Sequence, residues 1–177
     1  VFSPMGCRSF LAPWKDENGN YKFEGRFNQG VVSINLPQIA IIANGDEDKF
    51  WKLLDERLEI CKEALMCRHY ALLGTKSDIS PVHWQYGAIA RLEKGEKIDK
   101  LLYGGYSTMS LGYIGVYEMT KLMKGVSHTT PEGHDFALKV MKYLRETTDR
   151  WKKETNIGFA LYGTPAESLC HRFARID

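Results

Sequence analysis

The sequence predicts an α/β fold built on a largely parallel sheet. A short β-branched run at residues 31–36 and a short apolar run at residues 157–162 alternate with long segments in which apolar residues recur at three- and four-residue spacing. Such helical segments are long enough to connect neighbouring parallel strands, and no internal repeat is visible. With 177 residues, 44% of them hydrophobic and 12% aromatic, the chain can bury a substantial core.

The first expected strand covers residues 31–36, between Gly30 and Pro37. Its β-branched composition favours extended backbone, and Asn28 should lie at its entrance. Upstream, residues 14–30 are rich in turn formers and contain an Asn-Gly pair, which predicts a surface hairpin or loop.

A long amphipathic helix is expected from residue 46 to about residue 74. It begins with an acidic first turn, which suits the positive end of a helix dipole. Its apolar positions follow helical spacing: Phe50, Leu54, Leu58, Cys61 and Leu65. Cys61 and Cys67 are six residues apart and therefore do not share a face, so we assign them packing roles.

The middle of the chain is less regular. A turn is expected at Ser80-Pro81, followed by a short helix over residues 86–92. Residues 103–112 combine apolar residues with Gly and Ser, which fits a strand that another backbone or a ligand approaches closely. A helix over residues 114–123 should then stop at Gly125.

The C-terminal third begins with a helix-start signal, Thr130-Pro131-Glu132, and the helix should reach about Lys153. Its apolar stripe consists of Phe136, Val140, Leu144 and Trp151. A strand over 157–162, a small-residue turn at 163–168 and a final helix should follow. Because helix N-termini present free N–H groups, this strand-turn-helix unit could hold an anion.

Charge and cysteine content narrow the functional classes. The net charge is +2, with acidic and basic residues interspersed, so no extended nucleic-acid-binding surface is expected. No apolar run approaches the roughly 20 residues of a membrane-spanning helix, and no secretory signal opens the sequence. Four cysteines without a C-x-x-C pair, and five histidines without metal-binding spacing, predict reduced thiols, no metal site and a cytoplasmic location.

Cys7 is the candidate for chemistry. Gly6 permits a tight backbone and Pro4 keeps the preceding residue extended, so the thiol should sit on a rigid loop. From the residue alone two interpretations stay open, a reactive thiol or a small buried hydrophobe.

Five stretches together resemble the anaerobic (class III) ribonucleoside-triphosphate reductases, in order and over essentially the whole chain. They are MGCRSFL at residues 5–11, GRFNQGVVSINLP at 25–37, ALMCRHYALLG at 64–74, HWQYGA at 83–88 and GFALYGTPAES at 158–168. The resemblance implies part of a ten-stranded α/β barrel of the glycyl-radical enzyme type, with the loop cysteine at its centre. Residues 1–177 would be a fragment of this single catalytic domain, with the cysteine loop at 1–30 and the phosphate loop at 163–168.

The resemblance also implies roles for individual residues. Cys7 would carry a thiyl radical that abstracts the ribose 3′-hydrogen, and Asn28 would hold the ribose, with Asn35 as the less favoured candidate for that contact. The substrate phosphates would be bound by the turn Gly163, Thr164, Pro165, Ala166, Glu167 and Ser168. Since the carboxylate of Glu167 would repel phosphate, we interpret it as a helix cap.

Further expectations concern groups that the sequence does not contain. The family resemblance implies a glycyl radical and a zinc site elsewhere in a longer protein, formate or a thiol system as reductant, and ATP or deoxynucleotide effectors. The expected partners are a ribonucleoside triphosphate, a radical-SAM iron-sulfur activating enzyme and a second subunit. As a central fragment, the chain should be inactive alone. Two alternatives are a pyruvate formate-lyase-type glycyl-radical enzyme and a non-catalytic α/β nucleotide-binding module.

Overall fold

The computed structural model describes residues 10–165 and 167–177. Its strands are β1 (Phe27–Asn35), β2 (Ser107–Ile114) and β3 (Gly158–Gly163). Its α-helices are α1 (Leu36–Ala43), α2 (Glu47–Leu72), α3 (Pro81–Trp84), α4 (Val116–Lys124), α5 (Pro131–Thr155) and α6 (Glu167–Ala174). Two single-turn 3₁₀ helices lie at Ser77–Ile79 and Asp99–Leu101.

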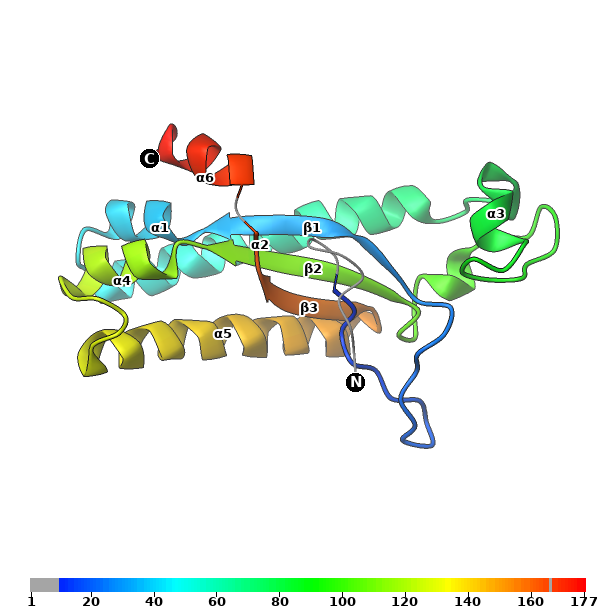
Figure 1. The fold of residues 1–177 in the computed structure, drawn as a ribbon, viewed down its shortest axis with the longest axis horizontal. Coiled ribbons are helices and arrows are strands. Elements are labelled where there is room, and N and C mark those ends of the chain that lie inside the picture. The colour runs from blue at the N-terminus through cyan, green and yellow to red at the C-terminus, as the bar shows by residue number, and fades with distance from the viewer. Residues whose placement is uncertain (1–9, 166) are drawn as a thin grey trace. The chain divides into compact units, whose positions relative to one another are not determined.

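The three strands form one sheet in the order β1-β2-β3, and their arrows point the same way in Figure 1. The ends of the sheet agree with parallel pairing, since the Phe27 N–H donates to the Tyr106 carbonyl and the Thr164 N–H to the Tyr113 carbonyl. The predicted α/β class with a parallel sheet is therefore confirmed. These three strands do not test the ten-stranded barrel that the family resemblance implies.

Contacts along the chain define two compact units. The first contains residues 10–31, 64–110 and 149–160, and the second contains residues 32–63, 111–148 and 161–177.

In the first unit, Trp151 of α5 packs edge-on against Phe159 of β3, with ring centroids 5.5 Å apart. A second core in this unit comes from the irregular middle of the chain and consists of Trp84, Leu92, Ile98, Leu101 and Leu102. Phe27 at the start of β1 joins this core through a T-shaped contact with Trp84 at 5.3 Å. This packing fixes the N-terminal end of β1.

In the second unit, helices α2 and α5 pack through the apolar residues from which the sequence predicted them. Phe50 of α2 meets Phe136 of α5 at 5.6 Å between ring centroids, and both are buried. Leu54, Leu58, Val140 and Leu144 extend the same core. The apolar stripes inferred from the sequence are thus the buried faces.

Helix α1 begins directly where β1 ends, and the sequence analysis did not predict it. Asn35 closes the strand and also caps the helix, its Oδ1 accepting from the Gln38 N–H at 3.3 Å. Pro37 lies in the first turn, where its missing N–H costs nothing. The residue that marks a strand end in the sequence is therefore a helix start.

The expected short helix over residues 86–92 is wrong. Residues 86–89 form bends and residues 90–92 have no regular structure, and the helical turn lies just before them at α3, where Pro81 occupies the first turn. Gly87 has φ +94°, a left-handed conformation that breaks any helix there. The strand expected at 103–112 begins at Ser107, because residues 103–106 form a turn with two glycines at positive φ.

Candidate functional site

The residues proposed from the sequence fall in both units, and two of them lie outside the described residues. These two are Cys7 and Ala166. Asn28 belongs to the first unit, whereas Asn35, Gly163, Thr164, Pro165, Glu167 and Ser168 belong to the second.

Asn28 lies in β1, and all of its side-chain donors are engaged. Its Nδ2 donates to the Phe10 carbonyl at 2.9 Å and to the Ser110 hydroxyl oxygen at 2.8 Å. Its Oδ1 accepts from the Gly30 N–H at 2.7 Å. Since an amide has two N–H donors and an oxygen with two lone pairs, one acceptor position is left for a further ligand.

The next residue, Gln29, connects β1 to helix α2 on the other side of the strand. Its Nε2 donates to Ser107 Oγ at 2.7 Å and lies 3.3 Å from His69 Nδ1. Ser107 in turn donates to the Leu102 carbonyl at 2.6 Å. His69 is fully buried and its ring meets Tyr103 at 4.9 Å, and this burial lowers the pKa of His69 below its ordinary value.

Hydrogen-bond directions in this network agree with a neutral His69 ring. The Leu102 carbonyl can only accept, so the Ser107 hydroxyl donates to it and must itself accept from the Gln29 amide nitrogen. That nitrogen lies 3.3 Å from His69 Nδ1, where its second N–H is placed to donate to a neutral ring. His69 is therefore a structural neutral histidine.

In the second unit, Thr164 begins the turn after β3 and is held at both its backbone and its side chain. Its N–H donates to the Tyr113 carbonyl at 3.1 Å. Its Oγ1 lies 2.8 Å from the hydroxyl of Ser33 in β1, a residue 131 positions away in sequence. Ser33 is a residue that the sequence analysis missed.

Gly112 makes room for this pair of hydroxyls. A Cβ at this position would lie 2.2 Å from Thr164 Oγ1 and 2.5 Å from Ser33 Oγ, well inside van der Waals contact. Glycine on the intervening strand β2 is therefore what allows the two hydroxyls to meet. The Gly- and Ser-rich composition of this strand was the available sequence signal.

The described members of the turn are exposed or partly exposed to solvent. Gly163, Glu167 and Ser168 are exposed, while Thr164 and Pro165 are half-buried. Glu167 is the first residue of α6, with φ +36°, and its carboxylate lies at the positive end of the helix dipole. The turn thus presents small residues and hydroxyls at a helix N-terminus.

Asn35 has two structural partners. In addition to capping α1, its Nδ2 donates to Asp177 Oδ1 at 2.8 Å. Its carboxamide therefore supports the junction between β1 and α1, whatever else it contacts.

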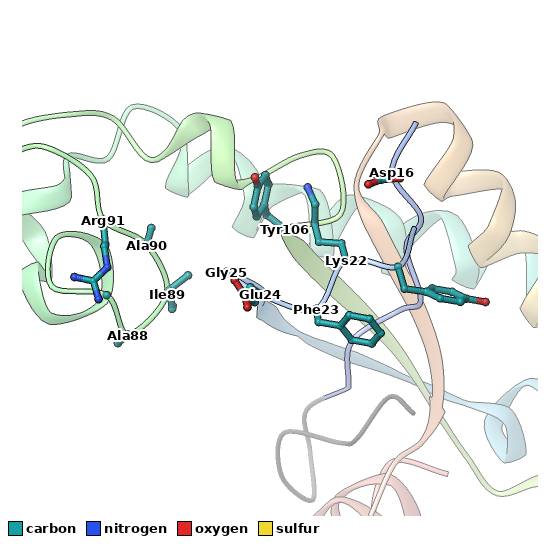
Figure 2. A pocket seen from close by; sticks show the side chains of 12 residues that line it. Asp16, Lys22, Phe23, Glu24, Gly25, Ala88, Ile89, Ala90, Arg91 and Tyr106 are labelled. Carbon is teal, nitrogen blue, oxygen red and sulfur yellow. The ribbon is translucent and has the colours of Figure 1, made fainter. Parts of the chain in front are cut away.

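The first unit also contains an open pocket of about 940 Å³ that includes none of the predicted site residues (Figure 2). Lys22 lies over the ring of Tyr106, with its Nζ 3.5 Å from the centroid, and donates to the Gly104 carbonyl at 2.9 Å. Arg91 lies on the opposite side of the hollow in the same view. The pocket is a mixed polar surface with both signs of charge.

Two kinds of feature are absent from the part of the chain that the structure describes. Within residues 10–165 and 167–177, no three His, Cys, Asp or Glu side chains gather in an arrangement suited to a metal ion. In the same ranges, no helix is both long enough and apolar enough to cross a membrane.

Comparison with known proteins gives consistent matches. A sequence model of the family described as anaerobic ribonucleoside-triphosphate reductase matches residues 1–177. The anaerobic ribonucleoside-triphosphate reductase of Salmonella typhimurium is 44% identical over 178 residues, and that of Enterobacteria phage T4 is 42% identical over 180 residues. Each alignment covers 99% of this chain but only 25% and 28% of the respective relative. The chain spans about a quarter of the length of these relatives.

Solved structures show the same fold. The anaerobic ribonucleotide reductase from Thermotoga maritima with glycerol in the active site matches with a TM-score of 0.65 and 23% identity, over 93% of this chain and 26% of that chain. The same enzyme with dATP bound in the specificity site matches with a TM-score of 0.65 and 24% identity, over 93% of this chain and 27% of that chain.

Proposed function

Because this chain belongs to the anaerobic ribonucleoside-triphosphate reductase family, we propose that it is part of the catalytic domain of an enzyme that makes 2′-deoxyribonucleoside triphosphates. The observation that carries the proposal is the family match over all 177 residues, with identities above 40% to bacterial and phage reductases. We further propose that β1, β2 and β3 are three strands of a ten-stranded barrel in a single catalytic domain.

Cys7 is the proposed radical carrier. Its sulfur takes the hydrogen atom from ribose C3′, so that a C3′–H bond breaks and an S–H bond forms. The 2′-hydroxyl then takes up a proton and leaves as water, and formate or a thiol system supplies two reducing electrons and the hydrogen that C2′ gains. Return of the hydrogen atom from sulfur to C3′ restores the thiyl radical. Such an open-shell intermediate requires a site that excludes water and oxygen.

Asn28 is the proposed ribose contact in the first unit. The hydrogen bonds that its amide already makes determine whether it would donate to or accept from the ribose. Both N–H groups are donated to protein oxygens, whereas Oδ1 accepts only the Gly30 N–H. Asn28 would therefore accept a hydrogen bond from a ribose hydroxyl rather than donate one.

The turn 163–168 is the proposed phosphate loop in the second unit. Its strand-turn-helix setting, its solvent-exposed members and the Ser33–Thr164 hydroxyl pair support this role. Hydroxyl and backbone donors at the positive end of a helix dipole stabilise a polyphosphate. Asn35 is kept as a second candidate for substrate contact.

The remaining components are proposed for parts of the protein beyond this chain. A glycyl radical, generated by a radical-SAM iron-sulfur activating enzyme, would pass its spin to Cys7, and zinc would bind in another region. A second subunit would complete a homodimer. ATP and deoxynucleotides would act as effectors, in keeping with the dATP held in the specificity site of the Thermotoga maritima relative.

The test compares the full-length protein with its Cys7→Ser and Cys67→Ser variants. An O–H bond is much harder to break homolytically than an S–H bond, so Cys7→Ser should accept the glycyl radical and bind nucleotide but form no deoxynucleotide. Cys67 is exposed on α2, and Cys67→Ser should keep normal turnover. Electron paramagnetic resonance and a product assay measure the two steps. Deoxynucleotide formation by Cys7→Ser, with the glycyl signal present, contradicts the proposal.

A further inference from the structure

The chain segment that follows Cys7 is held by side chains from both neighbouring strands. We call residues 10–14 the stem, since it begins three residues after Cys7. Asn28 of β1 donates to the Phe10 carbonyl at 2.9 Å, and Thr108 of β2 accepts the Ala12 N–H at 3.3 Å. The stem is thus tied to two strands at alternate residues, although it pairs with neither as a strand.

A buried arginine secures the same segment. Arg26 is only 6% exposed; its Nη2 donates to the Ala12 carbonyl at 2.5 Å and its Nε to the Gly105 carbonyl at 2.6 Å. Further along the stem, the ring of Trp14 fills the place where Gly105 lacks a Cβ, which would lie 2.1 Å from the ring. The stem is therefore fixed along its length.

Ser110 acts on the stem through Asn28. The Phe10 carbonyl can only accept and the Gly30 N–H can only donate, so together they fix which end of the Asn28 amide is the nitrogen. The second N–H then points to Ser110 Oγ, which accepts it at 2.8 Å. Ser110 is fully buried, and its hydroxyl keeps the amide in the plane that reaches Phe10.

The central strand carries these hydroxyls on one face. Thr108 and Ser110 are two residues apart, so their side chains project on the same side of β2, whereas Ser107 projects on the other. All three residues are fully buried, in a position where apolar residues are usual. Packing alone does not explain why these two buried positions carry hydroxyl side chains, whereas their hydrogen bonds with Ala12 and Asn28 do.

We propose that Thr108 and Ser110 are positioning residues that hold the stem, and through it the Cys7 loop, in the register required for hydrogen-atom transfer. The inference rests on the proposed function of Cys7. It assigns the two residues no contact with substrate. A displacement of the reacting sulfur by about 1 Å can lower a rate by about a hundredfold. For Thr108, which acts on the stem directly, the effect should therefore appear in turnover and not in substrate binding. Ser110 acts through Asn28, the proposed ribose contact, so its loss should affect both.

The test uses the full-length enzyme with Thr108→Val, Ser110→Ala and the rescue variant Thr108→Ser. Thr108→Val preserves shape but removes the acceptor for the Ala12 N–H, and Thr108→Ser restores it. Ser107→Ala is the matched control, because it also removes a buried, hydrogen-bonded hydroxyl from β2 but on the opposite face. We expect kcat to fall at least about tenfold in Thr108→Val and Ser110→Ala, with glycyl-radical content unchanged in both, and to recover in Thr108→Ser. KM should stay unchanged in Thr108→Val, whereas it should rise in Ser110→Ala, because Ser110 also holds the amide of Asn28, the proposed ribose contact.

Amide hydrogen exchange of a peptide covering the stem gives a readout independent of activity. Exchange should accelerate in Thr108→Val and Ser110→Ala but not in Ser107→Ala. Unchanged kcat, a change in KM alone, or equal losses in Ser107→Ala overturn the positioning role. If the wild-type enzyme forms no deoxynucleotide, the proposed function fails instead, and the exchange result still decides whether the two hydroxyls hold the stem.

Discussion

Replacing Gly112 with Ala tests the geometry of the proposed phosphate loop with a single methyl group. That methyl would lie 2.2 Å from Thr164 Oγ1 and 2.5 Å from Ser33 Oγ, so at least one hydroxyl must move. Overpacking of this kind costs about 1–3 kcal/mol, and loss of the Ser33–Thr164 hydrogen bond adds about 1 kcal/mol. We expect Gly112→Ala to lower the free energy of unfolding by about 2–4 kcal/mol.

The same displacement should weaken nucleotide binding. If Thr164 donates to a substrate phosphate, losing this hydrogen bond to a charged group costs about 1.5–3 kcal/mol, which raises the dissociation constant about 10- to 150-fold. Calorimetric titration of the full-length enzyme with a ribonucleoside triphosphate measures this change. Urea denaturation measures the stability change on the same samples.

Two further variants separate the clash from a general effect of alanine. Gly163→Ala, on the adjacent strand, places its Cβ no closer than 3.4 Å to any neighbour and should leave stability nearly unchanged. Gly112→Ala combined with Thr164→Ala should be less destabilising than the sum of the single changes, because the nearer of the two hydroxyl oxygens that the methyl meets is gone. Wild-type stability and affinity in Gly112→Ala would refute the arrangement of Ser33, Gly112 and Thr164 described above.

Three other predictions follow from single residues. Asn28→Ala should abolish most turnover and also destabilise the protein by about 2–4 kcal/mol, because three hydrogen bonds are lost; a variant of normal stability would contradict the bonding described for Asn28. Burial depresses the pKa of His69 below its ordinary value of 6.5, so the unfolded chain binds the proton more readily than the folded one. The contribution of His69 to stability should therefore be full above about pH 6.5 and fall at lower pH. Urea titrations at several pH values should show a smaller dependence of stability on pH in His69→Gln. Burial raises the pKa of Cys61 to about 11, so iodoacetamide at pH 8 should label Cys61 far more slowly in the native than in the unfolded protein, as mass spectrometry would show; equal rates would contradict its burial.

The sequence was sufficient to predict the long helices. It was insufficient where a residue type, such as proline or glycine, is compatible with two different local structures. Helices α2 and α5 follow from their apolar spacing, which the buried residues confirm. Helix α1 did not follow, because Pro37 after a β-branched run indicates a strand end as readily as a helix start. Residues 86–92 show the same ambiguity, since a glycine within an apolar run gives no sign of its φ.

The candidate site was predictable only in part, for a physical reason. Asn28 and the turn 163–168 were proposed from family resemblance. Their partners are distant in sequence, with Ser110 lying 82 positions from Asn28 and Ser33 lying 131 positions from Thr164. Such pairs are set by strand order, and one sequence does not specify which strands are neighbours. The Gly and Ser residues of the strand expected at 103–112 indicated a close approach there, but not what approaches.

The direct junction of β1 with α1 limits how this region can vary in length. Asn35 is the last strand residue and the helix cap, so no linker separates Ser33 from the first turn of α1. One inserted residue would either turn Ser33 to the opposite face of the sheet or rotate the buried side of α1 by about 100°. The turn at residues 16–20 carries no such coupling and is exposed throughout. We therefore expect natural insertions, epitope tags and spectroscopic labels to be tolerated in that turn, and a single added residue at the junction to abolish nucleotide binding.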